Sequence, residues 1–306
     1  MSSPEPFLAR CCPHCGAAAT ATVEMASRQR AEALPFDKLV SCWNGFFKEK
    51  VFFSYSRCAS CDLLFTPTFF DDAQLGRLYA GMPPNMESVP ADTLARTQRG
   101  YFDWLRANAR FSGGYLEVGA DVGLFARNCV EAGGFDRYWL YEPNRDVAPA
   151  LDAVVKGHDS EIIHDMSGFD AVPDGAVGVV VMIHVLDHLL DPMTTLKELR
   201  TKLQPGGKIL IVTHDESSLL RRVFGAAWPP FCLQHPQLFQ PSTIKRVLTD
   251  AGFTGVKVRR SVNHFPIAFL FKHLMWAIGL KWEKTPAFGN LSVGLRLGNM
   301  MTLASA

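Results

Sequence analysis

The sequence predicts an α/β protein in which a mostly parallel β-sheet follows a small cysteine-containing module. Two observations predict this class. From about residue 112 onward, short apolar runs alternate with amphipathic segments of helical length, a pattern typical of βα units in a parallel sheet. Before residue 70, two Cys-x-x-Cys pairs occur instead. The chain has 306 residues, enough for one large domain and one small one.

The composition is that of an ordinary globular protein, with 48% hydrophobic and 20% charged residues. The 31 basic and 30 acidic side chains leave a net charge of +1, so there is no electrostatic reason to expect nucleic acid as a partner. The first residues lack the basic start and apolar run of a signal peptide. We therefore expect a cytoplasmic protein without disulfides.

The most apolar stretch, Phe265 to Leu280, contains Lys272 and His273 and is shorter than the roughly 20 apolar residues that span a bilayer. We expect no integral membrane segment. The stretch is interpreted as a buried or lid helix, and a helix lying on a membrane surface is the alternative.

Four of the eight cysteines form the pairs Cys12/Cys15 and Cys58/Cys61. A Cys-x-x-Cys turn directs two thiolates to one point, and two such turns supply the four ligands of a structural Zn²⁺ site. We therefore expect a closed zinc site in the N-terminal region. The alternatives are unrelated buried thiols or a redox pair. Cys11 is an alternative candidate for the ligand position of Cys12, but only Cys12 has the two-residue spacing to Cys15.

The two pairs are separated by 42 residues, so the loop between them must carry structure. A hairpin around Asn44-Gly45, in the aromatic segment from Leu39 to Tyr55, would bring them together. These features predict a zinc-ribbon-like module over residues 1–70. A helical linker, 71–110, and a larger domain, 111–306, follow.

The elements expected in the linker and larger domain follow from hydrophobic periodicity. Strands are predicted at residues 114–118, 137–141, 161–164, 177–183, 208–213, 256–260 and 299–305. Helices are predicted at residues 92–109, 122–132, 145–155, 192–203, 242–251 and 265–280. The Pro-Gly-Gly sequence at Pro205 to Gly207 is expected to end one helix and start the next strand.

The most informative segment runs from Tyr115 to Phe125, where a strand, a tight loop and a helix follow in order. Gly119 and Gly123 let the backbone approach a ligand at the carboxyl end of the first strand, where open α/β sheets bind ligands. Glu142 ends the second strand and can accept both ribose hydroxyls of an adenosine cofactor. Taken alone, this loop fits an NAD site equally well.

The rest of the domain resembles class I S-adenosylmethionine (SAM) dependent methyltransferases. Glu117-x-Gly119-x-x-x-Gly123 matches their first motif, and Glu142 matches the acid after their second strand. Residues 169–189 resemble their fourth strand and its loop, and residues 196–213 resemble their next helix, Pro-Gly-Gly turn and fifth strand. The resemblance, over about residues 112–305, implies a Rossmann-like parallel sheet with an antiparallel last strand. The cysteine pairs are also similar to those of bacterial methyltransferases that include sugar C-methyltransferases, whose long extra C-terminal domain is missing here.

The resemblance implies which residues bind SAM. Glu117 and the loop would hold the methionine portion, Glu142 the ribose, and Asp165 with Met166 the adenine, while His184 would lie beside the cofactor. Asp121 replaces a glycine that is often found in the first motif. The complete set is Glu117, Gly119, Ala120, Asp121, Gly123, Glu142, Pro143, Asp165, Met166 and His184.

Two histidines are candidate catalytic bases. His188 follows the fourth strand and has an ordinary pKa near neutrality, although it can equally cap the next helix or hold the cofactor. His235 lies in an insertion at about 215–240, where such folds place acceptor-binding residues. Asp187 is expected to orient His188 or to cap a helix. The aromatic side chains of the insertion either line an acceptor pocket or pack in the core: Phe224, Trp228 and Phe231.

We therefore predict a SAM-dependent methyltransferase that acts on a small-molecule acceptor such as a sugar, a nucleotide-sugar or a secondary metabolite. A Rossmann dehydrogenase would need a glycine where Glu117 stands, and it leaves Pro205 to Gly207 unexplained. The alternative is a catalytically silent protein of this fold that binds a partner through its zinc module. Asp121 and the lack of an unambiguous base keep that alternative open.

Overall fold

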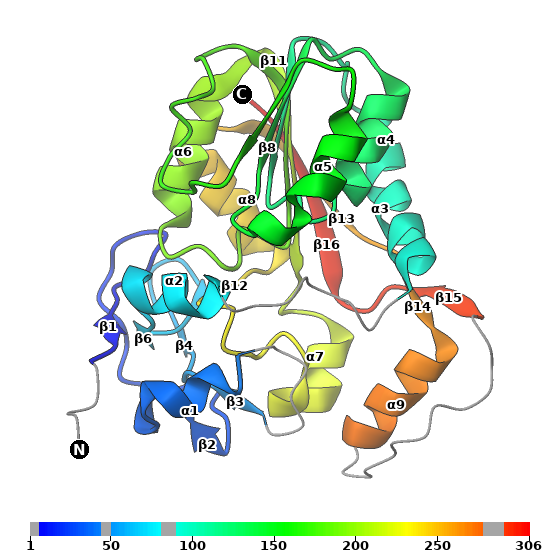
Figure 1. Ribbon diagram of the computed structural model, residues 1–306. Helices are drawn as coiled ribbons and strands as arrows, with labels where there is room; N and C mark the ends of the chain where they lie inside the picture. The colour runs from blue at the N-terminus through cyan, green and yellow to red at the C-terminus, as the bar shows by residue number, and fades with distance from the viewer. Residues whose placement is uncertain (1–5, 44–49, 81–89, 278–290) are drawn as a thin grey trace.

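The computed structural model describes residues 6–43, 50–80, 90–277 and 291–306 (Figure 1). Two predicted features lie partly outside these ranges. They are the hairpin around Asn44-Gly45 and the end of the helix predicted at 265–280. In the described part of the chain, no helix combines the length and apolar character needed to cross a bilayer.

A seven-stranded sheet forms the centre of the larger domain, with the order β13-β16-β11-β10-β7-β8-β9. β16 is antiparallel to both of its neighbours, whereas the other strands are parallel to one another. This confirms the predicted Rossmann-like sheet with an antiparallel last strand. The bounds are β7 Gly114–Val118, β8 Arg137–Tyr141, β9 Ser160–Ile163, β10 Val177–Ile183, β11 Leu203–His214, β13 Thr254–Arg260 and β16 Asn299–Ser305.

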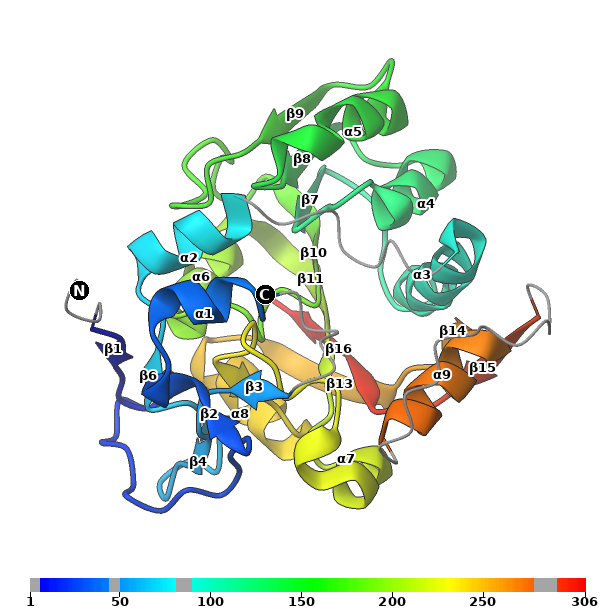
Figure 2. The same ribbon diagram turned by 60° about the horizontal axis from the view of Figure 1, so that its bottom comes forward.

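Helices cover both faces of the sheet (Figures 1 and 2). One face packs against α3 (Ala91–Arg106), α4 (Leu124–Ala132) and α5 (Ala148–Val155). The other packs against α6 (Pro192–Lys202) and α8 (Pro241–Asp250). Because both faces are covered, the central strands are buried on both sides, which explains their continuous apolar runs.

Pro205 to Gly207 was wrongly predicted to separate a helix from a strand. These residues lie within β11, near its start, and Gly206 has a φ of 76°. The ladder between β10 and β11 shifts register here, since Val177 pairs with Leu203 but Val179 pairs with Lys208. The three residues therefore form an irregularity inside the strand rather than its beginning.

The N-terminal region and the insertion after β11 share a small sheet. β12 (Gln237–Leu238), from the insertion, pairs with β5 (Leu64–Phe65), which pairs with β4 (Ser56–Arg57). Both segments lie beyond the carboxyl ends of the parallel strands (Figure 1). The remaining elements are β1 Leu8–Ala9, β2 Gln29–Arg30, α1 Phe36–Val40, β3 Val51–Phe52, β6 Thr68–Phe69, α2 Asp72–Ala80, α7 Leu219–Phe224, β14 Asn263–Pro266, α9 Ile267–Ala277 and β15 Ser292–Leu295, with 3₁₀ turns at Ala31–Ala33, Arg145–Val147 and Gly225–Ala227.

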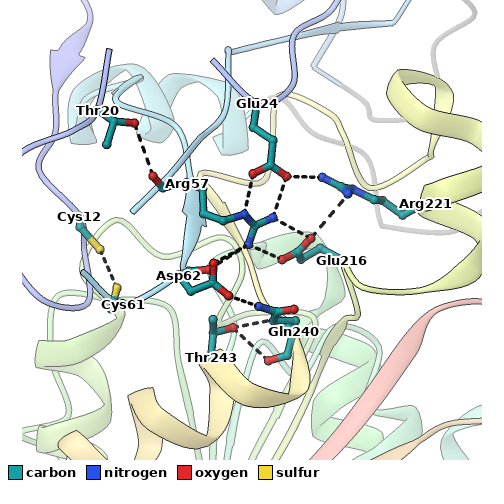
Figure 3. Close-up of polar contacts among 10 residues, drawn as sticks. All are labelled: Cys12, Thr20, Glu24, Arg57, Cys61, Asp62, Glu216, Arg221, Gln240 and Thr243. Atoms are coloured by element: carbon teal, nitrogen blue, oxygen red, sulfur yellow. Dashed lines mark hydrogen bonds and ion pairs between the residues drawn. The ribbon is translucent and has the colours of Figure 1, made fainter. Parts of the chain in front are cut away.

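Arg57 connects these two sequence-distant segments through charge (Figure 3). Its Nε and Nη1 atoms lie 2.6 Å from Glu24 and 2.9 Å from Glu216, respectively. Glu216, two residues after the end of β11, is almost completely buried. Arg221 of α7 lies 2.5 Å from Glu24. An arginine between two carboxylates fixes the orientation of all three groups. The module is thereby held in one position over the edge of the sheet.

We expect Arg57→Leu to lower the free energy of unfolding by about 3 kcal/mol, because the buried Glu216 carboxylate loses its main cation. Among the ion pairs of the residues that the structure describes, Glu216 keeps the one with Arg221, at the longer distance of 3.9 Å. Denaturant unfolding measures the change. Arg99→Leu is the matched control, since its ion pair with Asp103 is exposed and contributes at most about 0.5 kcal/mol. Equal losses in the two variants would contradict the role given to Arg57.

Candidate functional site

The turn between β7 and α4 has three residues in the left-handed region. The φ angles are 74° at Gly119, 49° at Asp121 and 75° at Gly123. A Cβ atom at Gly119 would lie 2.5 Å from a methyl group of Val185. Both this clash and the positive φ exclude a side chain at this position. Aspartate is among the few residues that tolerate left-handed backbone, which explains how Asp121 replaces a glycine.

Glu142 holds this turn from the end of β8. Its Oε2 atom accepts the N–H of Asp121 at 2.8 Å, and its Oε1 atom accepts the N–H of Asn144 at 2.9 Å. The side chain is buried. Each carboxylate oxygen has a second lone pair, so both can still accept a hydroxyl.

Glu117 lies beneath the turn and is only 2% exposed. Burial raises its pKa to about 8, although the hydroxyl of Tyr115, which donates a hydrogen bond of 2.6 Å to Oε2, opposes the rise. Burial and the charge of Glu142 also raise the pKa of Asp121 to about 6. Three carboxyl groups thus converge on one turn, an environment that favours a cationic ligand.

The other predicted cofactor residues lie at the same edge of the sheet. Pro143 directly follows Glu142, and Ala120 is buried within the turn. Asp165 and Met166 follow β9 and are exposed, and Asp165 accepts the N–H of Ser167 at 2.9 Å. His184, which follows β10, has a φ of 53°. The carboxyl ends of parallel strands meet at one edge, so residues distant in sequence lie close together.

Four histidines surround Asp187 beside this turn. His184 and His188 come from the loop after β10, His214 ends β11, and His235 comes from the insertion. The ring centroids of His184 and His214 are 4.6 Å apart, and those of His214 and His235 are 5.0 Å apart. Asp187 is completely buried. Burial would raise its pKa, but the imidazoles lower it to about 2, so the group is a carboxylate.

The two predicted bases contact each other, with 3.1 Å between the Nε2 atoms of His188 and His235. The hydroxyl of Tyr79 lies 3.1 Å from Nδ1 of His188, and the carbonyl of Pro230 lies 2.6 Å from Nδ1 of His235. Burial and His235 lower the pKa of His188 to about 3. For His235, burial lowers the pKa, but Cys232 and Asp187 raise it to about 9.

Several sequence interpretations change here. Asp187 does not cap the helix after it; the side chain of Asp191 does, accepting the N–H of Thr194 at 3.0 Å. Trp228 and Phe231 pack in a buried core with Phe52 and Tyr55. Of the two predicted roles, core packing therefore applies to them rather than lining of an acceptor pocket. His214, Tyr79 and Asn299 were missed. A polar residue at the carboxyl end of a buried strand was a signal for His214.

The four cysteines of the two pairs converge, as predicted. Sγ of Cys12 lies 3.4 Å from that of Cys61, Sγ of Cys15 lies 3.5 Å from that of Cys58, and all four lie within 4.8 Å of one another. Zinc–sulfur bonds of about 2.3 Å in a tetrahedron require sulfur separations of about 3.8 Å, which these distances approach. Cys11 is exposed and lies outside this group, so Cys12 is the member of the cluster.

The two cysteine turns have the same backbone geometry. The N–H of Gly16 donates to the carbonyl of Cys12, and the N–H of Asp62 donates to the carbonyl of Cys58, both at 2.9 Å. Gly16 and Asp62, each directly after a pair, have φ angles of 71° and 66°. The left-handed residue turns the chain away so that both sulfurs of a pair face one point.

A family model described as a methyltransferase domain matches residues 93–258. Among solved structures, the fold is similar to that of a chain from the complex between the Haloferax volcanii Trm112 methyltransferase activator and the putative methyltransferase, with a TM-score of 0.51, 15% identity, and coverage of 70% of this chain and 93% of that one. It is also similar to YcgJ from Bacillus subtilis, with a TM-score of 0.50, 11% identity, and coverage of 68% and 97%. A SAM-dependent methyltransferase from Thermotoga maritima, described as a possible histamine N-methyltransferase, has a TM-score of 0.46, 14% identity, and coverage of 69% and 90%. No curated protein matches the chain in sequence.

We expect Glu117→Gln to flatten the pH dependence of stability of the ligand-free protein. The unfolded chain releases the proton near pH 4.5, whereas the folded protein keeps it to about pH 8. The stabilising contribution is therefore complete below about pH 4.5 and is lost as the pH rises to about 8, at up to about 1.4 kcal/mol per pH unit.

Denaturant unfolding between pH 5 and pH 8 measures this slope. Glu131→Gln, which changes an exposed side chain of α4, is the control and should leave the slope as it is in the wild type. A Glu117→Gln protein with the wild-type slope would show that another group titrates in this range.

Proposed function

The chain belongs to the methyltransferase-domain family, and from this premise we propose that it transfers the methyl group of SAM to a small-molecule acceptor. The turn from Gly119 to Gly123, held by Glu142 over a buried Glu117, is the observation that carries the proposal. When bound, SAM supplies an electrophilic methyl group whose transfer to an acceptor atom leaves the C–S bonding electrons on sulfur and neutralises the sulfonium.

Each part of the site has a proposed role. The turn and Glu117 bind the methionine portion, Glu142 and Pro143 bind the ribose, and Asp165 with Met166 borders the adenine. The convergence of three carboxyl groups supports this assignment, because a bound sulfonium or ammonium group would be attracted to their ionised forms and would favour ionisation of Glu117. His184 lies beside the cofactor. The remaining work of the protein is to position the two reactants.

We assign proton transfer from the acceptor to His188 and His235. The hydroxyl of Tyr79 lies within hydrogen-bonding distance of Nδ1 of His188. A hydroxyl of the acceptor in the same position would contact that nitrogen instead. Once His235 has lost a proton, which its pKa of about 9 places at alkaline pH, a proton taken up at Nδ1 would allow His188 to pass its Nε2 proton to Nε2 of His235, 3.1 Å away. Asp187 supplies a compensating negative charge, so it acts as a positioning residue rather than as the base.

We infer the acceptor class from the side chains at this edge of the sheet. The N-terminal module and the insertion lie beyond the carboxyl ends of the strands (Figure 2), and Asp187, together with His235 and Gln237 of the insertion, is buried there. Buried polar side chains of this kind favour a small polar acceptor, such as a sugar, a nucleotide-sugar or a secondary metabolite. The alternative is a catalytically silent protein, in which the module recruits a partner.

We expect calorimetric titration to detect SAM and its demethylated product binding to the wild type. Glu142→Ala should weaken both by about 1 to 3 kcal/mol, because ribose hydroxyls lose their acceptor and the turn loses its support. Glu161→Ala is the matched control, because this acid of β9 pairs with Arg137 away from the turn. If the folded protein binds neither compound, the proposed methyltransferase activity is contradicted and the catalytically silent alternative is favoured.

We also propose that Cys12, Cys15, Cys58 and Cys61 hold a structural Zn²⁺. The spacing of the sulfurs and the paired turns support this proposal. Four thiolates close the coordination sphere, so this ion would stabilise the module over residues 1–70 and take no part in the reaction. Residues 71–110 would connect the module to a catalytic domain over residues 111–306.

The intense thiolate-to-metal absorption of a cobalt-substituted protein tests the zinc proposal. We expect the wild type to show it and Cys58→Ser to lose most of it, because one of four thiolates is removed and the tetrahedron is broken. Cys11→Ser is the control, since this exposed neighbour lies outside the cluster. Full absorption in the Cys58→Ser protein would place the metal elsewhere.

A further inference from the structure

A second group of metal-ligating side chains lies at the ends of two neighbouring strands. His184 and Asp187 follow β10, and His214 is the last residue of β11. One ligand atom from each lies within 4.8 Å of the other two. We propose that these three residues form a second metal site, which binds a divalent transition-metal ion.

Two buried polar atoms in this group have no hydrogen-bond partner among the residues that the structure describes: Oδ1 of Asp187 and Nδ1 of His184. Asp187 has no exposed surface, and its Oδ2 atom accepts a long hydrogen bond of 3.5 Å from the N–H of His214. An ionised carboxylate in such surroundings is destabilised unless it is paired or coordinates a metal. A bound cation would satisfy the Asp187 oxygen.

Asn299, at the start of β16, orients the ring of His214. Its Oδ1 atom lies 2.9 Å from Nδ1 of His214, which places the ring proton on Nδ1 and leaves a lone pair on Nε2. That Nε2 atom lies 3.9 Å from Oδ2 of Asp187. Metal-binding histidines commonly donate their second N–H to a polar partner in this way. The Nδ2 atom of Asn299 also lies 3.4 Å from Nε2 of His184.

The backbone at His184 is held in an unusual conformation. Its φ of 53° lies in the left-handed region, and its N–H donates to the carbonyl of Val212 at 2.8 Å. This bond ties the end of β10 to β11 and brings the His184 ring to within 4.6 Å of the His214 ring, centroid to centroid. Left-handed backbone at a residue other than glycine is maintained chiefly where a site requires it.

The ligand set indicates which ions fit. Two imidazole nitrogens and one carboxylate suit Zn²⁺, Fe²⁺, Co²⁺ or Ni²⁺, whereas Mg²⁺ and Ca²⁺ prefer oxygen ligands. Three protein ligands leave coordination positions open, in contrast to the closed cysteine cluster. If the proposed function is correct, an oxygen or nitrogen of the acceptor would occupy an open position; this last step rests on that function, but the metal site does not.

Cobalt titration of the metal-free full-length protein, without SAM or acceptor, tests the site. We expect two equivalents per chain, of which only one gives thiolate-to-metal absorption. Asp187→Asn should remove the other equivalent and keep the thiolate absorption, and Cys58→Ser should do the reverse. Asn299→Leu should weaken the second equivalent about 10- to 100-fold, as expected for a group that orients a ligand.

His158→Ala is the control, because this exposed histidine lies outside the group and its loss should leave two equivalents. A wild type that binds only the thiolate-linked equivalent would overturn the proposal, as would an Asp187→Asn protein that binds the second equivalent with unchanged affinity. The wild-type stoichiometry decides even if a variant fails to fold. SAM binding is measured separately, so failure of the proposed function would leave this result intact.

Discussion

A hydrogen bond from the backbone N–H of Asp121 to the buried carboxylate of Glu142 connects the first two strands of the sheet at their carboxyl ends. The turn above it contains three left-handed residues, of which Asp121, unlike the two glycines, costs backbone free energy that this bond helps to offset. The same carboxylate also holds the chain after β8, through the N–H of Asn144. The proposed cofactor site therefore depends on one side chain that has structural and ligand-binding roles together.

The edge of the sheet divides into two electrostatic halves. Carboxyl groups converge at the turn after β7, and imidazoles converge around Asp187 after β10 and β11. The first half favours a cation such as the sulfonium, and the second contains the nitrogen atoms needed to move a proton or bind a metal. Arg57 and Glu216 hold the N-terminal module against the insertion (Figure 3). Tyr79, His188 and His235, from distant parts of the sequence, meet in the second half.

Local pattern was sufficient wherever an element is defined by its own residues. The bounds of β7, β8, β10 and β16 match the predicted strands, because continuous apolar runs are typical of strands buried on both faces. The cysteine pairs were equally predictable from their spacing. Local pattern failed at Pro205 to Gly207, where a register shift against β10 keeps a turn-like sequence inside a strand. Pairing with a neighbour outweighed the local preference of these residues.

The sequence by itself determined the βα order, the tight loop after the first strand and which cysteines form the two pairs, since each follows from residues close together in the chain. Only the tertiary structure decided that His188 contacts both His235 and the hydroxyl of Tyr79. It also decided that His184, Asp187 and His214 converge. These residues come from separate loops and strand ends. Their proximity results from strand order and from the fold of the insertion over the sheet, which short-range sequence patterns do not encode.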